Sequence, residues 1–305
     1  MWRSLLMGEI QLSLQTEGTA GGLKTLTEAD KAYAESFSEA IDVTNSTMIL
    51  QYGSAAQKKV SSFADSALRS IPDHDLEEIS QDLSKLITVL EQFERDFDQR
   101  DKLNKTVKSL YDKVELQASE TARRLEIHRS SLLRHMNLLR KHYESCLDTV
   151  KEFDMYIYAG KLCISRSRAE TLTELAEQAK HSGSQIDVIA AADYKDACAR
   201  LERKLYDLSV TRQLPIQTAS YIRTVMNSDE LMAENLRRLN ANAFPLWKQR
   251  LVLSMGYSYD TEASPAMFHE TNQTLIAALK QMTAAMKKSL EERKKAEQLF
   301  HGKKS

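Results

Sequence analysis

Three histidines recur every seven residues in the middle of the chain, and a cysteine follows the last of them by four residues: His128, His135, His142 and Cys146. Imidazoles and thiolates are zinc ligands, but two ligands on one helix must be three or four residues apart to meet at one ion. A spacing of seven separates successive histidines by about 10.5 Å. We therefore expect no metal site, and we interpret the histidines as residues that flank a helical seam.

The three cysteines offer a second kind of chemistry, the reduction of an oxyanion by thiols. Cys146, Cys163 and Cys198 have no nearby resolving cysteine and no motif that lowers a thiol pKa. Two of them occupy apolar heptad positions, which favours small buried side chains. Their odd number and wide spacing indicate thiols of a reducing compartment, without a disulfide framework.

A set of polar side chains near glycine and proline positions could bind an anion. The candidates are Tyr52, Gln57, Arg212, Gln217, Arg223 and Asn227. An arginine fork matches an oxyanion, and residues four apart share a helix face. The alternative is a polar network that fixes helix register. The role of Gly53 also has two interpretations, because a glycine inside a helix permits either close helix packing or a ligand pocket.

Trp247 and Lys248, which follow Pro245, are a candidate partner contact. A tryptophan is either a core anchor or an interface hot spot, and both interpretations stay open. The lysine clusters near the C-terminus alternate with glutamates, which favours a solvated helix face over contact with lipid or RNA.

No motif of an enzyme is present in the sequence. It lacks the phosphate loop, the dinucleotide fingerprint, the nucleophile elbow and the zinc protease motif. The 42 basic and 43 acidic residues nearly cancel, so there is no overall basic field of the kind that nucleic-acid binders carry. We therefore expect a protein that is not an enzyme, uses no cofactor and binds no nucleic acid.

Long helices must position these residues, because residues that break helices are scarce. The chain has 9 glycines and 4 prolines in 305 residues, where average usage would supply roughly 21 and 15. Apolar residues alternate at spacings of three and four over 76–97, 132–157 and 194–208, which is the pattern of heptad helices. The first of these sets comprises Leu76, Ile79, Leu83, Leu86, Leu90, Phe93 and Phe97.

These patterns predict an all-α fold in which long heptad-patterned helices form a bundle with a projecting antiparallel coiled-coil hairpin at about 105–213. We expect a single elongated helical domain over 25–300, between a flexible N-terminal tail (1–24) and a basic tail (301–305). A helix is expected from Ser46 to Arg69, and a helix break at Gly160.

No segment approaches the ~20 apolar residues that span a bilayer, and the N-terminus has no secretory pattern. The expected location is the cytoplasm, with peripheral contact at the inner membrane face as the alternative.

Several separate blocks of the sequence resemble the toxic anion resistance family, the TelA/KlaA-like tellurite resistance proteins. The blocks are Ile41–Ser46, Ile49–Gly53, Ala56–Lys58, Phe63–Asp65, Tyr156–Gly160, Arg212, Gln217–Ala219, Ile222–Arg223 and Pro245–Lys248. The resemblance implies a bacterial helical protein linked to resistance to tellurite and to cell-envelope stress, and it carries over no catalytic residue.

Three hypotheses about function follow from the residues and the resemblance together. The first is a non-enzymatic stress protein, a scaffold or adaptor that docks protein partners such as other tellurium-resistance or envelope-stress proteins. The alternatives are a direct oxyanion-binding protein and a membrane-surface coiled-coil protein. Heptad seams close within one chain or between two, so an oligomer stays open.

Overall fold

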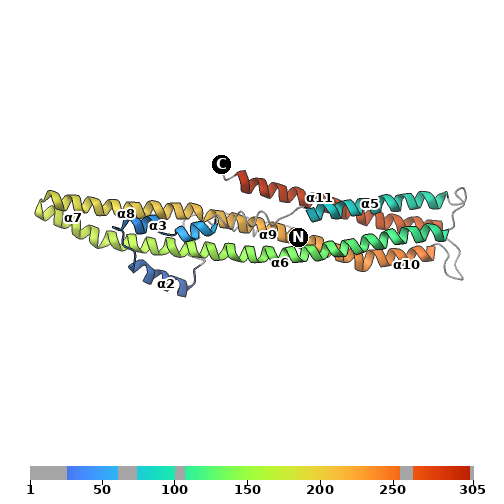
Figure 1. Cartoon of the computed structure of the whole chain (residues 1–305), viewed down its shortest axis with the longest axis horizontal. Coiled ribbons are helices and arrows are strands. Elements are labelled where there is room, and N and C mark those ends of the chain that lie inside the picture. Colours follow the sequence, from blue (N-terminus) through green and yellow to red (C-terminus); the bar gives the residue numbers. More distant parts are fainter. Residues whose placement is uncertain (1–25, 61–73, 100–106, 255–263, 303–305) are drawn as a thin grey trace. The chain divides into compact units, whose positions relative to one another are not determined.

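A computed structural model describes residues 26–60, 74–99, 107–254 and 264–302 of the chain. Every regular element in these residues is helical, which confirms the all-α prediction (Figure 1). The expected tail over 1–24 lies outside the described residues, as do residues 303–305 of the expected basic tail.

The contacts divide the chain into two compact units. One comprises Met1–Ser66 with Tyr143–Ala219, and the other comprises Ala67–His142 with Ser220–Ser305. Helices α6 (Val107–Ala169) and α9 (Gln213–Arg238) contribute to both units. The single domain over 25–300 and the hairpin bounds of 105–213 stay predictions.

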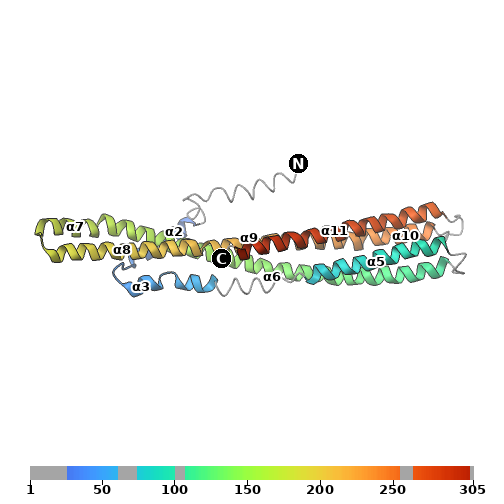
Figure 2. The ribbon, with the colours of Figure 1, turned by 90° about the horizontal axis from the view of Figure 1, so that it is seen from above.

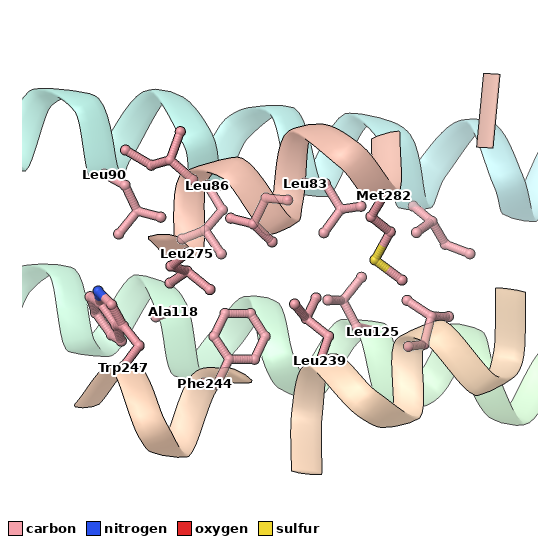
Figure 3. Packing of buried hydrophobic residues seen from close by; sticks show 14 of the residues in the cluster. Leu83, Leu86, Leu90, Ala118, Leu125, Leu239, Phe244, Trp247, Leu275 and Met282 are labelled. Atoms are coloured by element: carbon pink, nitrogen blue, oxygen red, sulfur yellow. The ribbon is translucent and has the colours of Figure 1, made fainter. Parts of the chain in front are cut away.

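The second unit is a helical bundle around a long apolar seam. It is built from α5 (His74–Asp98), the first part of α6, most of α9, the π-helical turn η2 (Leu239–Ala243), α10 (Phe244–Ser254) and α11 (Pro265–Gly302). The heptad residues of α5 are all 2% exposed or less, which confirms that set as core. Figure 3 shows Leu83, Leu86 and Leu90 pointing toward side chains of α6, α10 and α11.

Aromatic side chains close one part of this seam. The ring of Phe268 on α11 stacks on Phe97 with centroids 3.7 Å apart and meets Phe93 edge-on at 5.1 Å. Offset and edge-on aromatic pairs add about 0.5–1.5 kcal/mol each to the apolar burial.

The first unit joins short N-terminal helices to a helical hairpin. Its elements are α2 (Glu28–Glu39), α3 (Ser46–Gln51), a helical segment over 54–60, the second part of α6, α7 (Thr171–Ser182), α8 (Gln185–Thr211) and the start of α9. Thr27 and Asp30 form the capping box that starts α2, as their spacing predicts. Apolar residues of α8, among them Leu201 and Leu205, pack with Phe153 and Cys163 of α6. Helix α8, which contains the third heptad set at 194–208, therefore packs on α6.

Two of the predicted helix boundaries are wrong. Gly160 is not a break, because α6 continues through it to Ala169. A glycine costs a helix only about 1 kcal/mol, and the flanking Ala159 and Cys163 bury their side chains against α8. Gly160 instead permits close packing, since a Cβ atom here would lie 2.5 Å from the Leu205 Cδ2 atom.

The helix expected over Ser46–Arg69 is interrupted in the structure. Helix α3 ends at Gln51, Gly53 takes a left-handed φ of +67°, and helix resumes at residue 54. Residues 61–69 lie outside the described part of the chain. Glycine is required here twice over, because its φ is positive and because a Cβ would lie 2.8 Å from both Leu208 methyl carbons.

Candidate functional site

Arg212 is the best-defined of the predicted anion-site residues, and its guanidinium holds a carboxylate of the chain itself. The backbone of Arg212 caps the C-terminus of α8. Its Nε and Nη2 atoms donate to the two carboxylate oxygens of Asp154 on α6, at 2.6 and 3.1 Å. Asp154 is buried, and a two-point fork between charged groups is both strong and geometrically specific. The fork therefore ties α8 to α6.

Tyr52 and Gln57 lie at the same junction. The Tyr52 hydroxyl donates to the backbone oxygen of Tyr156 at 2.7 Å, and burial raises the pKa of this hydroxyl. The Gln57 side chain accepts from Lys204 Nζ at 3.1 Å and donates to Thr211 Oγ1 at 3.4 Å. The structure thus brings Tyr52, Gln57 and Arg212 together where the 54–60 segment, α6 and α8 meet.

The other predicted anion-site residues do not extend this group. Gln217 is half-buried near the start of α9. Arg223 and Asn227 are exposed and belong to the second unit. The six-residue anion site stays a prediction.

Trp247 and Lys248 are directed into the second unit. The indole of Trp247 is buried, and its Nε1 donates to Asn272 Oδ1 at 3.4 Å. The Lys248 ammonium donates to Glu115 Oε1 at 2.5 Å and to Ser119 Oγ at 2.7 Å. Figure 3 shows Trp247 among the core side chains.

The three cysteine thiols are packed within the fold. All three cysteines are buried and free, and burial raises the pKa of the Cys146 thiol to about 12 and also raises those of Cys163 and Cys198. A raised pKa leaves little nucleophilic thiolate near neutral pH. Among the described residues, no group of three or more histidine, cysteine or carboxylate side chains could hold a metal ion.

Comparison with known proteins decides the family. A family profile described as "Toxic anion resistance protein (TelA)" matches residues 34–267, most of the chain. The chain belongs to the TelA family. A TelA-like protein of Staphylococcus epidermidis is 27% identical over 262 residues, covering 82% of this chain and 70% of that relative. The match confirms the resemblance seen in the separate sequence blocks.

Two further relatives are described as uncharacterized proteins. One from Listeria monocytogenes is 28% identical over 288 residues, covering 90% of this chain and 71% of the relative. YaaN of Bacillus subtilis is 29% identical over 244 residues, covering 75% of this chain and 63% of the relative. No solved structure matches the chain.

The hairpin that α7 and α8 form in this TelA-family chain presents apolar side chains to solvent. Helices α7 and α8 pair across Gly183, whose φ is +61°, and they extend beyond α2 and α3 in both views (Figures 1 and 2). No residue over 168–196 is buried. Ile186, Val188 and Ile189 are 77%, 53% and 56% exposed. Over 170–196 the sequence has six carboxylates against two lysines. No helix among the described residues is long and apolar enough to cross a membrane.

Sequence analysis missed one polar cluster in the TelA-family fold. Arg293 of α11 is 2% exposed and pairs with the buried Asp229 of α9, whose second carboxylate oxygen lies 2.8 Å from His135 Nδ1. Ser228 accepts from the same guanidinium. Arg293 sits inside a lysine-rich run that is typical of a solvated face, so only its position on the apolar side of α11 could have distinguished it.

Proposed function

We propose that this TelA-family chain contributes to resistance to toxic anions such as tellurite, and to cell-envelope stress, as a non-enzymatic helical scaffold or adaptor. Membership of the TelA family supports the role in resistance to toxic anions. The contacts of Tyr52, Gln57 and Arg212 support the mode of action, because each of these side chains is hydrogen-bonded to another residue of the chain.

The observation that carries the proposal is the apolar start of α8. The sequence from Gln185 to Tyr194 has isoleucine, valine or alanine on every side of the helix, and only one side can face α7. Helices that are apolar all round are normally covered. In α8 the first buried residue is Ala197, three turns into the helix. A protein partner would cover these side chains, and other tellurium-resistance or envelope-stress proteins are the proposed class.

The same contacts weigh against the two alternatives. Direct oxyanion binding through Arg212 would have to displace the Asp154 carboxylate, which holds both arms of the fork. The membrane alternative relies on the basic C-terminal helix, where glutamates alternate with the lysines, and the hairpin adds an excess of carboxylates, which anionic lipids repel. We therefore propose action in the cytoplasm, through protein partners.

Growth on tellurite tests the proposal in a host that lacks its own TelA-family genes or has them deleted. A variant with Ile186→Ser, Val188→Ser and Ile189→Ser is compared with the wild type. Leu116→Ser is the matched control, because Leu116 is also exposed, at 65%, but lies on α6 in the second unit. We expect the wild type and the control to restore growth and the hairpin variant to fail at equal abundance. Full rescue by the hairpin variant would contradict the proposal.

A further inference from the structure

Two helices of the first unit enclose a small aromatic cavity that none of the proposed functions uses. Tyr33 and Phe37 lie one turn apart on α2, and Glu152 and Tyr156 lie one turn apart on α6. Together with Ala34 and Met155 they line a cavity of about 230 Å³. Drug-sized ligand pockets span roughly 300–1,000 Å³. This cavity therefore suits a small ligand or a single head group.

The aromatic walls are held in place by packing behind them. The rings of Phe37 and Tyr156 meet edge-on with centroids 5.9 Å apart, and both contact the buried ring of Tyr52. The hydrogen bond from Tyr52 to the Tyr156 backbone fixes this arrangement. Tyr33 is 65% exposed and forms the outer wall. Three aromatic rings thus surround a space that solvent can reach.

Of the residues that line the cavity, one is charged, and it is acidic. Glu152 contributes a carboxylate to the lining, and the faces of aromatic rings carry the negative part of their quadrupole. Burial raises the pKa of the Tyr156 hydroxyl, and the Glu152 carboxylate raises it further. These features favour a cation and disfavour an oxyanion.

The chain already places an alkylammonium group against this carboxylate. The Lys59 Nζ atom lies 2.7 Å from Glu152 Oε2, and the Lys59 side chain is 61% exposed. Lys59 is not among the residues that line the cavity. A ligand cation would share Glu152 with Lys59 or replace it.

We propose that the cavity between α2 and α6 binds a small alkylammonium cation, held by the rings of Tyr33, Phe37 and Tyr156 and by the Glu152 carboxylate. This inference does not rest on the scaffold function, since the cavity and the exposed start of α8 share no residue. A cation over aromatic faces beside a carboxylate gains both a cation–π and a Coulombic attraction.

Choline and its neutral carbon isostere 3,3-dimethylbutanol test the proposal on the full-length protein. The two molecules have the same shape and differ in charge, so only a cation site separates them. We expect choline to shift the tyrosine and phenylalanine ring resonances saturably, with a millimolar dissociation constant, and to bind about tenfold more tightly than the alcohol. Equal binding of the two molecules, or no saturable shift with choline, would overturn the proposal.

Variants assign the effect to the cavity. Glu152→Gln and Phe37→Leu should each weaken choline binding several-fold, because the first removes the charge and the second removes a ring face while keeping an apolar side chain. Lys59→Met should strengthen binding, since it removes the competing ammonium. Glu35→Gln is the control: Glu35 lies on α2, like Phe37, and its carboxylate accepts from the Tyr158 hydroxyl, but it does not line the cavity. Weakened binding in the control, or unchanged binding in Glu152→Gln, would refute the assignment.

A second ligand identifies the source of the cation. Nα-acetyl-lysine amide, whose ε-ammonium is free, presents the alkylammonium group of a protein side chain. Choline presents that of a free metabolite. Tighter binding of the lysine derivative would support the site and assign it to a protein ligand. Tighter binding of choline would support the site and assign it to a small molecule.

Discussion

Replacing Arg212 with methionine distinguishes a structural role for this residue from an anion-binding one. In the structure its guanidinium donates twice to Asp154, and the two side chains are 12% and 2% exposed. Methionine keeps the apolar stem and leaves the carboxylate buried without its two charged donors. Loss of one partner from a buried ion pair costs about 3–5 kcal/mol of unfolding free energy. The thermal midpoint should fall by roughly 6–20 °C.

Two further variants make this test specific. The double variant Arg212→Met, Asp154→Leu removes both charges, so it should recover most of the lost stability and come within about 2 kcal/mol of the wild type. Arg223→Met is the matched control, because Arg223 is exposed and belongs to the second unit. It should change the unfolding free energy by no more than about 0.5 kcal/mol.

Urea unfolding followed by circular dichroism measures these free energies, with and without tellurite. We expect tellurite to leave all the midpoints unchanged. A loss of unfolding free energy below about 1 kcal/mol in Arg212→Met would refute the structural role, since even an exposed ion pair contributes up to about that much. Stabilisation of the wild type by tellurite, absent in Arg212→Met, would show that the guanidinium binds the anion.

Three other substitutions test the packing and the buried groups. Gly160→Val should destabilise the protein by about 1–3 kcal/mol in urea unfolding, because its side chain would overlap Leu205; an unchanged midpoint would contradict the close approach. Arg293→Met should cost about 3–5 kcal/mol by removing the guanidinium from the buried Asp229 carboxylate, which would keep the contact of its second oxygen with His135, and a loss no larger than that of an exposed arginine would count against it. Burial raises the pKa of the Cys146 thiol to about 12, so its contribution to stability is complete below the ordinary thiol pKa of ~8.5 and is lost as pH rises from there toward 12. The urea midpoint of the wild type should therefore fall more steeply from about pH 8 to 11 than that of Cys146→Ala. Parallel plots of midpoint against pH for the two proteins would show that the Cys146 thiol does not cause this pH dependence.

The heptad pattern was sufficient to predict the seam of the second unit. Every apolar residue at spacings of three and four over 76–97 is buried, because a stripe that covers one face of a helix has to be covered by other helices. The capping box at Thr27 and the turn at Gly183 were also predictable, since both depend on short-range backbone chemistry.

The effects of the glycines depended on tertiary contacts that no local pattern reveals. Gly160 and Gly53 have similar helical neighbours in sequence, yet α6 passes through the first and α3 ends just before the second. In both cases α8 packs against the glycine, through Leu205 at Gly160 and through Leu208 at Gly53. The packing of α8 explains why both positions are glycine, and the positive φ of Gly53 explains why the helix is interrupted there alone.

The sequence left open whether the polar candidates bind an anion or form a polar network, and it did not identify the residues that Tyr52, Gln57 and Arg212 contact. Asp154 lies between apolar heptad positions 153 and 157 on α6, and nothing in its neighbourhood distinguishes it from a solvent-facing carboxylate. Its burial and its fork to Arg212 arise only when α8 folds back on α6. The same holds for Glu152, which shares the aromatic cavity with Tyr33 and Phe37 of α2.

Site-specific photocrosslinking from position 189 in tellurite-challenged cells tests the scaffold proposal most directly. A photoreactive amino acid replaces Ile189, which is 56% exposed on α8, and in a parallel strain it replaces Leu116 on α6, which is 65% exposed. The proposal predicts a discrete crosslinked protein from position 189 that disappears when Ile186 and Val188 are changed to serine. Identical crosslinking patterns from positions 189 and 116, in cells that remain resistant, would contradict it.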